Sequence, residues 1–262
     1  MILTLLGLGG AAVFIGLIAS MIGVGGGIFM VPLLSLSGLV GTTQEAVGTS
    51  LAAVIFTSVS SSLAYRRQRV LKLDLGLIMM PGAVLGAWLG AYLTRFISPG
   101  GLSLAFGLLL LYPAGMMLHG RQPREVGLLF RRSRTTATGE YHPVEASLLG
   151  LGAGLTAGFF GIGGGIVMVP AMAIFLGLEI LQAVATSLFI MGPSALIGSL
   201  QHLLQGNLHP ELALPLILGI GLGAQLGPRL STRMSKARLR QWFGLVLLYS
   251  AVSMILSGIG LF

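Results

Sequence analysis

The sequence GVGGGIFMVP at residues 23–32 is repeated later in the chain as GIGGGIVMVP at residues 161–170. Four of the first five residues in each copy are glycine. Glycine adopts positive φ at little cost, so an apolar helix that arrives at either copy is expected to unwind there. We expect a second helix to begin at Ile28 and at Ile166. Its first N–H groups have no acceptor within the helix and lie at the positive end of the helix dipole, which favours a bound anion.

The two glycine clusters admit two interpretations. Small residues let helices pack closely in a membrane, and a single cluster is explained at least as well in this way. Two glycine-interrupted apolar segments in corresponding positions of two halves are instead typical of the binding site of a transporter. We therefore predict that the clusters bind substrate, through Gly23, Gly25, Gly26, Gly27, Gly161, Gly163, Gly164 and Gly165.

The composition is that of an integral membrane protein. Of the 262 residues, 55% are hydrophobic and only 8% are charged, about a third of the charged share of a soluble domain. Uncharged apolar runs of about 20 residues recur along the chain, and they do not alternate as barrel strands do. The sequence has no cysteine, which excludes disulfides and thiolate metal sites. It also lacks a zinc-protease motif and paired carboxylates, so we expect no enzyme, no metal site and no cofactor.

The chain is an internal duplication, because one register relates nearly the whole of its two halves. Gly23 and Gly161 are 138 residues apart, and after the clusters the spacing settles at 137. In this register VGTSL at 47–51 aligns with VATSL at 184–188, and Asp74 aligns with Glu211. The repeat predicts a first transmembrane repeat over 1–118, a basic cytoplasmic linker over 119–143 and a second transmembrane repeat over 144–262.

Each half contains three long apolar segments and two pieces that flank its glycine cluster. In the first half we expect helices over 3–22 and 28–39, a third ending at Tyr65, and two more over 73–93 and 102–118. The piece after the break has only about a dozen residues, which is short for a full span. Either both flanking pieces cross, giving about five spans in each half, or they form a hairpin that returns; we favour the first.

The basic residues indicate membrane orientation rather than nucleic-acid binding. All but Arg95 of the 15 lysines and arginines lie in three clusters between apolar segments, at 66–72, 121–134 and 229–240. Such loops mark the cytoplasmic side. The basic loop follows the third segment of the first half but the fourth segment of the second. We therefore predict an all-α membrane protein with two inverted-topology repeats, whose glycine-broken helices meet at the repeat interface and whose termini are both non-cytoplasmic.

Polar side chains near the clusters complete the predicted site. Thr49 and Ser50 recur in register as Thr186 and Ser187, so we include both pairs, although membrane hydroxyls also serve as bonds between helices. Gln225 is an uncharged donor that either lines the path or joins two helices.

The placement of acidic residues favours an anionic substrate. No Asp or Glu lies at the centre of an apolar segment, whereas a cation transporter with a buried carboxylate relay is expected to place one there. A small anion held by backbone N–H groups and hydroxyls fits better. Proton coupling stays open through His202, since the unperturbed pKa of a histidine is near neutrality, although a histidine at a helix end is also typical of the membrane interface.

The duplicated motif Gly-x-Gly-Gly-Gly-x-x-x-Val-Pro, each copy followed by a Thr-Ser pair, resembles the TauE/SafE (sulfite exporter, TSUP) family over essentially the whole chain. The resemblance implies a secondary transporter of the bacterial inner membrane that exports a small sulfur-containing anion such as sulfite or sulfoacetate by alternating access. Its partners are then the anion and the lipid bilayer, with no nucleic acid. An anion channel, or a transporter of another small anion or a metal cation, remains the alternative. The sequence leaves the direction of transport and the oligomeric state open.

Overall fold

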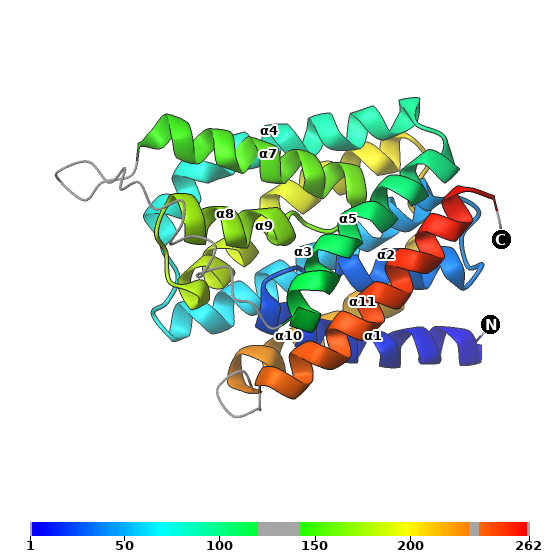
Figure 1. Cartoon of the computed structure of the whole chain (residues 1–262), viewed down its shortest axis with the longest axis horizontal. Helices are drawn as coiled ribbons and strands as arrows, with labels where there is room; N and C mark the ends of the chain where they lie inside the picture. Colours follow the sequence, from blue (N-terminus) through cyan, green and yellow to red (C-terminus); the bar gives the residue numbers. More distant parts are fainter. Residues whose placement is uncertain (1, 120–141, 231–235, 261–262) are drawn as a thin grey trace.

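The computed structural model describes residues 2–119, 142–230 and 236–260, and this part of the chain is all helical (Figure 1). The predicted linker lies almost wholly outside these ranges. The first half supplies α1 (Ile2–Ile22), α2 (Gly27–Leu36), α3 (Thr43–Arg67), α4 (Leu73–Leu93), the short 3₁₀ helix η1 (Thr94–Phe96) and α5 (Pro99–His119). The second half supplies α7 (Pro143–Phe160), α8 (Gly165–Phe175), α9 (Ile180–Leu204), α10 (Pro210–Leu230) and α11 (Lys236–Gly258).

Both predicted helix breaks are present. One lies between α1 and α2 and the other between α7 and α8. Three glycines in each break have positive φ, from 72° to 93°, a conformation that any side chain would strain. Several boundaries differ from the sequence prediction. The second helix of each pair begins at the last glycine of its cluster, and α2 ends at Leu36 because Gly38, with φ 67°, turns the chain there.

Pairs of helices from opposite halves build the bundle. α4 packs along α7, α1 along α10 and α5 along α11, and the α4–α7 pair is clear in Figure 1. Gly82, Gly86 and Gly90 form a stripe on α4 at which a Cβ would come within 2.1 Å of carbonyl oxygens of α7. Small residues at such contacts let two backbones approach closely in a membrane. These glycines therefore allow the close packing of α4 against α7.

The central pair consists of α3 and α9, the third helix of each half. The start of α3 meets the end of α9, since a Cβ at Gly48 would lie 2.8 Å from Cβ of His202. The Ser58 hydroxyl further along α3 donates a hydrogen bond to the Leu188 carbonyl, nearer the start of α9. The two equivalent helices therefore run antiparallel.

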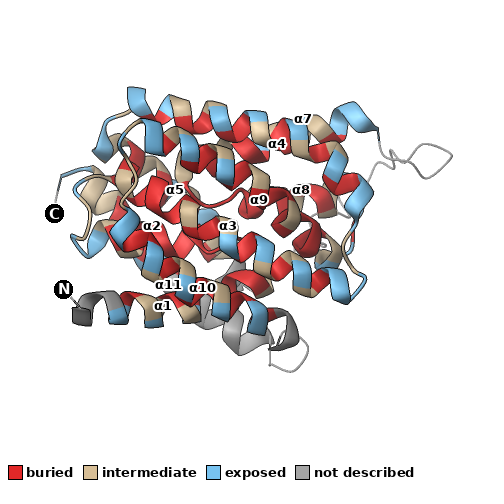
Figure 2. Ribbon diagram, turned by 180° about the vertical axis from the view of Figure 1, so that it is seen from behind, coloured by how far each residue is buried: buried red, intermediate tan, exposed pale blue. Residues whose placement is uncertain are grey.

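The outer surface of the bundle suits a lipid environment. Among the described residues, five helices are long and apolar enough to cross a membrane, namely α3, α4 with η1, α7, α9 and α10. Leucines such as Leu85, Leu148 and Leu218 are exposed on their outer faces. Figure 2 shows the buried residues gathered at the centre, in α2, α8 and the facing sides of α3 and α9. This is the arrangement of a multi-pass membrane protein, with the broken helices in its core.

Candidate functional site

The two glycine turns meet at the centre of the bundle. A Cβ at Gly27 would lie 1.9 Å from the Gly161 carbonyl oxygen, and a Cβ at Gly165 would lie 2.0 Å from the Gly23 carbonyl oxygen. Each turn therefore presses the first residue of its second helix against the backbone of the other turn. The predicted glycines are brought together in one place, and every one of them is buried.

A serine from the opposite half holds each turn. Ser50 donates to the Gly161 carbonyl at 3.0 Å, and Ser187 donates to the Gly23 carbonyl at 3.2 Å. Each serine also donates to a carbonyl of its own helix three residues earlier. The two predicted serines thus lie at the turns, where their first structural task is to clamp one half of the protein to the other.

The two threonines are next to the serines in the sequence, but they contact loop backbone instead of the glycine turns. The Thr49 hydroxyl accepts a hydrogen bond from the His209 N–H at 3.1 Å, and the Thr186 hydroxyl accepts one from the Lys72 N–H at 3.2 Å. Both threonines are buried. They fix the loops that precede α10 and α4, at opposite ends of the central helix pair, and the sequence interpretation of them as substrate donors stays a prediction.

The two glycine turns contain backbone N–H groups that donate no hydrogen bond to any described residue. Within the part of the chain that the structure describes, the N–H groups of residues 25–28 and 163–166 have no hydrogen-bond acceptor. All eight residues are buried. Nearly all buried N–H groups in proteins are paired, so two groups of unpaired donors at one centre are unusual. They also lie at the positive ends of α2 and α8, where an anion is favoured.

Two apolar side chains that we did not predict stand between the turns. A Cβ at Gly25 would lie 2.1 Å from Cε of Met191 and 3.1 Å from Cγ1 of Val54; at Gly163 these distances are 2.3 and 2.9 Å. The sequence did contain a signal for both residues. They occupy the same place in the two repeats, and each follows its serine by four residues, which puts it on the same helix face.

His202 packs near the glycine turn of the second repeat, where one of its ring nitrogens contacts a backbone carbonyl. Its Nε2 is 3.1 Å from the Gly158 carbonyl oxygen, while its Nδ1 has no partner among the described residues. In the first repeat the same place is held by Tyr65, whose hydroxyl donates to the Ser20 carbonyl at 3.0 Å. Both side chains tie a central helix to the helix that leads into a glycine turn. Each side chain thus has a structural contact, and the interpretation of His202 as a substrate or proton-coupling residue stays a prediction.

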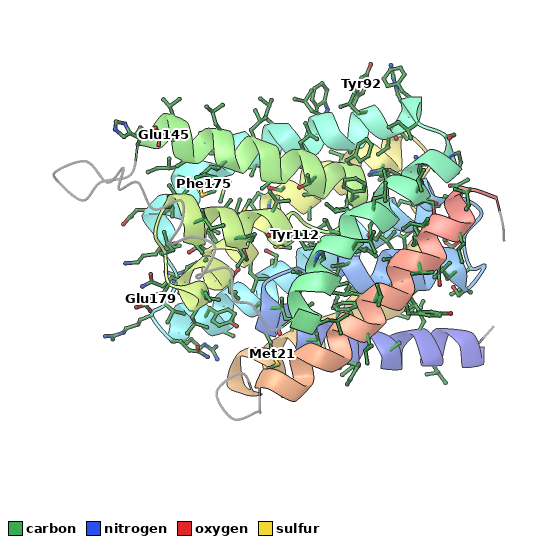
Figure 3. All side chains as sticks on the ribbon, in the orientation of Figure 1. Met21, Tyr92, Tyr112, Glu145, Phe175 and Glu179 are labelled. Carbon is green, nitrogen blue, oxygen red and sulfur yellow. The ribbon has the colours of Figure 1, made fainter. Side chains whose placement is uncertain are left out.

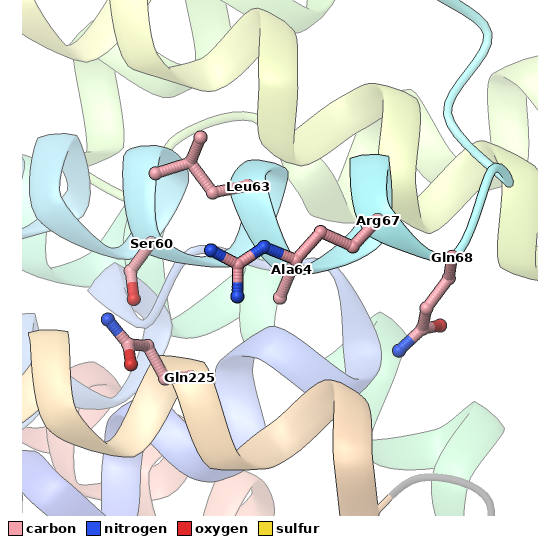
Figure 4. Close-up of a pocket in the computed structure, with 6 residues that line it drawn as sticks. All are labelled: Ser60, Leu63, Ala64, Arg67, Gln68 and Gln225. Atoms are coloured by element: carbon pink, nitrogen blue, oxygen red, sulfur yellow. The ribbon is translucent and has the colours of Figure 1, made fainter.

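Gln225 does not lie with the other predicted residues. It is exposed and lines a groove between α3 and α10, together with Ser60 and Arg67 (Figure 4). The sequence could not reveal this, because it does not fix which face of α10 turns towards α3.

The described acidic residues all lie in loops or first helical turns. Figure 3 shows Glu145 and Glu179 at one end of the bundle. At another loop, His209 joins the two halves: its Nε2 is 2.8 Å from a carboxylate oxygen of Glu45, and its Nδ1 is 3.0 Å from one of Glu211. The backbone N–H of His209 also donates a hydrogen bond to the Thr49 hydroxyl.

The stability of the protein is expected to depend on His209 within a defined pH range. Its hydrogen bonds to Glu45 and Glu211 raise the pKa of His209 above its usual value of 6.5. The folded state therefore binds this proton more tightly, and the stabilisation is complete below the usual pKa and lost as the pH rises through the raised one. Because the side chain is 35% exposed, we expect only about 0.5 kcal/mol.

Thermal unfolding of the wild type and of His209→Gln, followed from about pH 5 to about pH 9, checks this expectation. The wild type should be the more stable at acid pH, and the two curves should converge at alkaline pH. A difference that is the same at every pH would show that the proton on His209 plays no part.

Comparison with known proteins assigns the chain to a family. The model of the family "Sulfite exporter TauE/SafE" matches residues 8–254. "Probable membrane transporter protein YunE" of Bacillus subtilis (strain 168) is 34% identical over 218 residues, which cover 78% of this chain and 80% of that protein. "Probable membrane transporter protein" of Xylella fastidiosa (strain Temecula1) is 30% identical over 257 residues, which cover 94% and 93% of the two chains. No solved structure matches significantly. The family match includes both glycine turns, and the chain belongs to the sulfite exporter TauE/SafE family of membrane transporters.

Proposed function

We propose that this protein is a secondary transporter that exports a small sulfur-containing anion, such as sulfite or an organosulfonate like sulfoacetate. The anion binds between the two glycine turns, near the middle of the membrane. The observation that carries this proposal is the set of unpaired, buried N–H groups of residues 25–28 and 163–166. Such donors, at the starts of two helices, stabilise negative charge without a buried cation.

An anion fits this centre better than a cation does. Cation transporters place carboxylates, or other oxygen or nitrogen ligands, deep in the membrane, and here the described acidic residues lie at the ends of helices. The carbonyl groups of Gly23 and Gly161 could serve a cation, but each already accepts a serine hydroxyl. The preference for an anion therefore comes from the unpaired N–H groups at the starts of α2 and α8 together with the lack of a carboxylate among the residues of the two turns.

The contacts between the halves support an inverted repeat of about five spans each. Equivalent helices α3 and α9 run antiparallel, as expected when one repeat is turned over relative to the other. The serine contacts are reciprocal, with each half clamping the turn of the other. With the basic loops on the cytoplasmic side, both termini are non-cytoplasmic and the membrane is the bacterial inner membrane.

Transport then proceeds by alternating access, with the two halves rocking about the central turns. Val54 and Met191 fill the space between the turns in this structure. A bound anion has to displace the flexible end of Met191, because the glycine backbone on either side cannot retreat without disturbing the helix contacts. Methionine suits such a movable position, since its side chain is unbranched and adaptable.

Flux measurements in proteoliposomes test the proposal. We expect saturable movement of sulfite that depends on a gradient, and little movement of manganese or other divalent cations. Repeating the assay with an imposed pH gradient decides whether protons are coupled to transport. Flux without saturation or coupling would favour an anion channel, transport of cations alone would favour a metal transporter, and either result would contradict the proposed function.

A further inference from the structure

A polar groove lies between α3 and α10, away from the glycine turns (Figure 4). Its volume is 260 Å³, whereas one water needs only about 10–15 Å³ of such space. The Arg67 side chain runs back along α3, so that its guanidinium group points towards Ser60 and Gln225. The lining residues are Ser60, Leu63, Ala64, Arg67, Gln68 and Gln225.

The groove is rich in donors and positively charged. The Arg67 guanidinium offers a planar set of N–H donors that matches the oxygens of a phosphate or sulfonate group, and the Gln225 amide adds an uncharged donor beside it. No carboxylate lines the groove, and no described acidic residue forms an ion pair with Arg67. The Ser60 hydroxyl already donates to the Gly221 carbonyl at 3.0 Å, so it borders the site without a spare hydrogen.

The equivalent helices of the second repeat, α9 and α4, also pack together, but they have different residues at the corresponding positions. In the register of the duplication, Ser60, Arg67 and Gln225 correspond to Ile197, Leu204 and Trp88. The positions that are polar in the α3–α10 groove are therefore apolar or aromatic in the other helix pair. Membrane orientation accounts for a basic residue at position 67, but it does not account for an amide from α10 in the same groove.

We propose that the α3–α10 groove binds an oxyanion of the phosphate or sulfonate class, held by Arg67 and Gln225. Two sources offer this chemistry: the headgroup of an anionic phospholipid and a soluble oxyanion. Val59 and Leu63, exposed beside the groove, provide an apolar surface for an acyl chain, and basic sites between membrane helices commonly hold lipid headgroups. The proposal does not depend on which anion the central turns transport.

Native mass spectrometry of the purified full chain with phosphatidylglycerol or phosphatidylcholine tests the lipid source. Thermal unfolding in inorganic phosphate at constant ionic strength tests the soluble source. The key variant is Arg67→Leu, which copies Leu204 of the other repeat and should lower binding about tenfold or more. The matched control is Arg66→Leu, which copies Leu203 and removes the same charge from an exposed neighbour that does not line the groove.

Preferential retention of phosphatidylglycerol that is lost in Arg67→Leu and kept in Arg66→Leu would assign the site to a lipid. Stabilisation by phosphate with the same dependence on Arg67 would assign it to a soluble oxyanion. Equal losses in the two variants, or no binding of either ligand, would overturn the proposal. If Arg67→Leu does not yield folded protein, Gln225→Trp, which copies Trp88, replaces it with the same expected loss.

Discussion

Alanine at Gly27 or at Gly165 is expected to destabilise the protein far more than alanine at the exposed helix glycines Gly10 and Gly152. The new Cβ would lie 1.9 Å from the Gly161 carbonyl oxygen or 2.0 Å from the Gly23 carbonyl oxygen. Both atoms belong to the backbone, so the two turns must separate, and the serine clamps that hold them must lengthen. We expect a loss of about 3 kcal/mol for each variant, seen as a fall of about 10 °C in the midpoint of thermal unfolding.

The controls for this prediction are Gly10→Ala and Gly152→Ala. A Cβ at either position meets nothing within 4 Å, and neither glycine has positive φ. Alanine is the better helix former, so these variants should be neutral or slightly more stable. Because the two turns contact each other reciprocally, the effects at Gly27 and Gly165 should also be similar. A large effect at one and none at the other would refute the reciprocal packing that underlies the proposed site.

Shortening Met191 to alanine is expected to change which anions the protein transports. The Met191 methyl group lies against both glycine turns and has to move before an anion reaches their N–H groups. Its removal leaves room beside the donors without altering them. We expect the rate for a larger organosulfonate such as sulfoacetate to rise about tenfold relative to that for sulfite, since a change of about 1.4 kcal/mol in the barrier corresponds to a factor of ten.

Met79→Ala separates this effect from a general loss of stability. Met79 is fully buried on α4 and is not among the contacts of the glycine turns. Both truncations should destabilise the protein by about 2–5 kcal/mol, as is usual for a buried methionine. Only Met191→Ala should alter the ratio of the two transport rates, measured in proteoliposomes with equal amounts of folded protein. An unchanged ratio would mean that the anion does not pass Met191.

The sequence predicted the fold well because its strongest signals were local or repeated. Glycine clusters interrupt helices for reasons that act within a few residues, and both breaks were confirmed. Long uncharged runs predict membrane helices by length alone, and the bounds of α4 agree with the prediction at both ends. The small errors, such as the end of α2, came from a glycine turn that hydrophobicity does not reveal.

The site was harder to predict, because contacts between the halves decide it. The duplication identified Ser50 and Ser187 by their shared register, but it could not show that each serine reaches across to the turn of the other repeat. Met191 was missed because an apolar residue in an apolar helix does not stand out, although its register with Val54 was an available signal. Gln225 was grouped with the turns although the structure places it in the α3–α10 groove, since the sequence does not fix the rotation of a helix against its neighbours.

Equilibrium binding of sulfite to the purified protein, measured by titration calorimetry in parallel with a panel of divalent cations, tests the central claim most directly. If the unpaired N–H groups of the two turns hold an anion, sulfite should bind saturably, and this binding should persist in Arg67→Leu, which removes the charge of the α3–α10 groove. Met191→Ala should bind sulfite at the same stoichiometry, and the cations should not bind. Folded protein that binds no sulfite, or that binds only the cations, would contradict the anion site at the glycine turns.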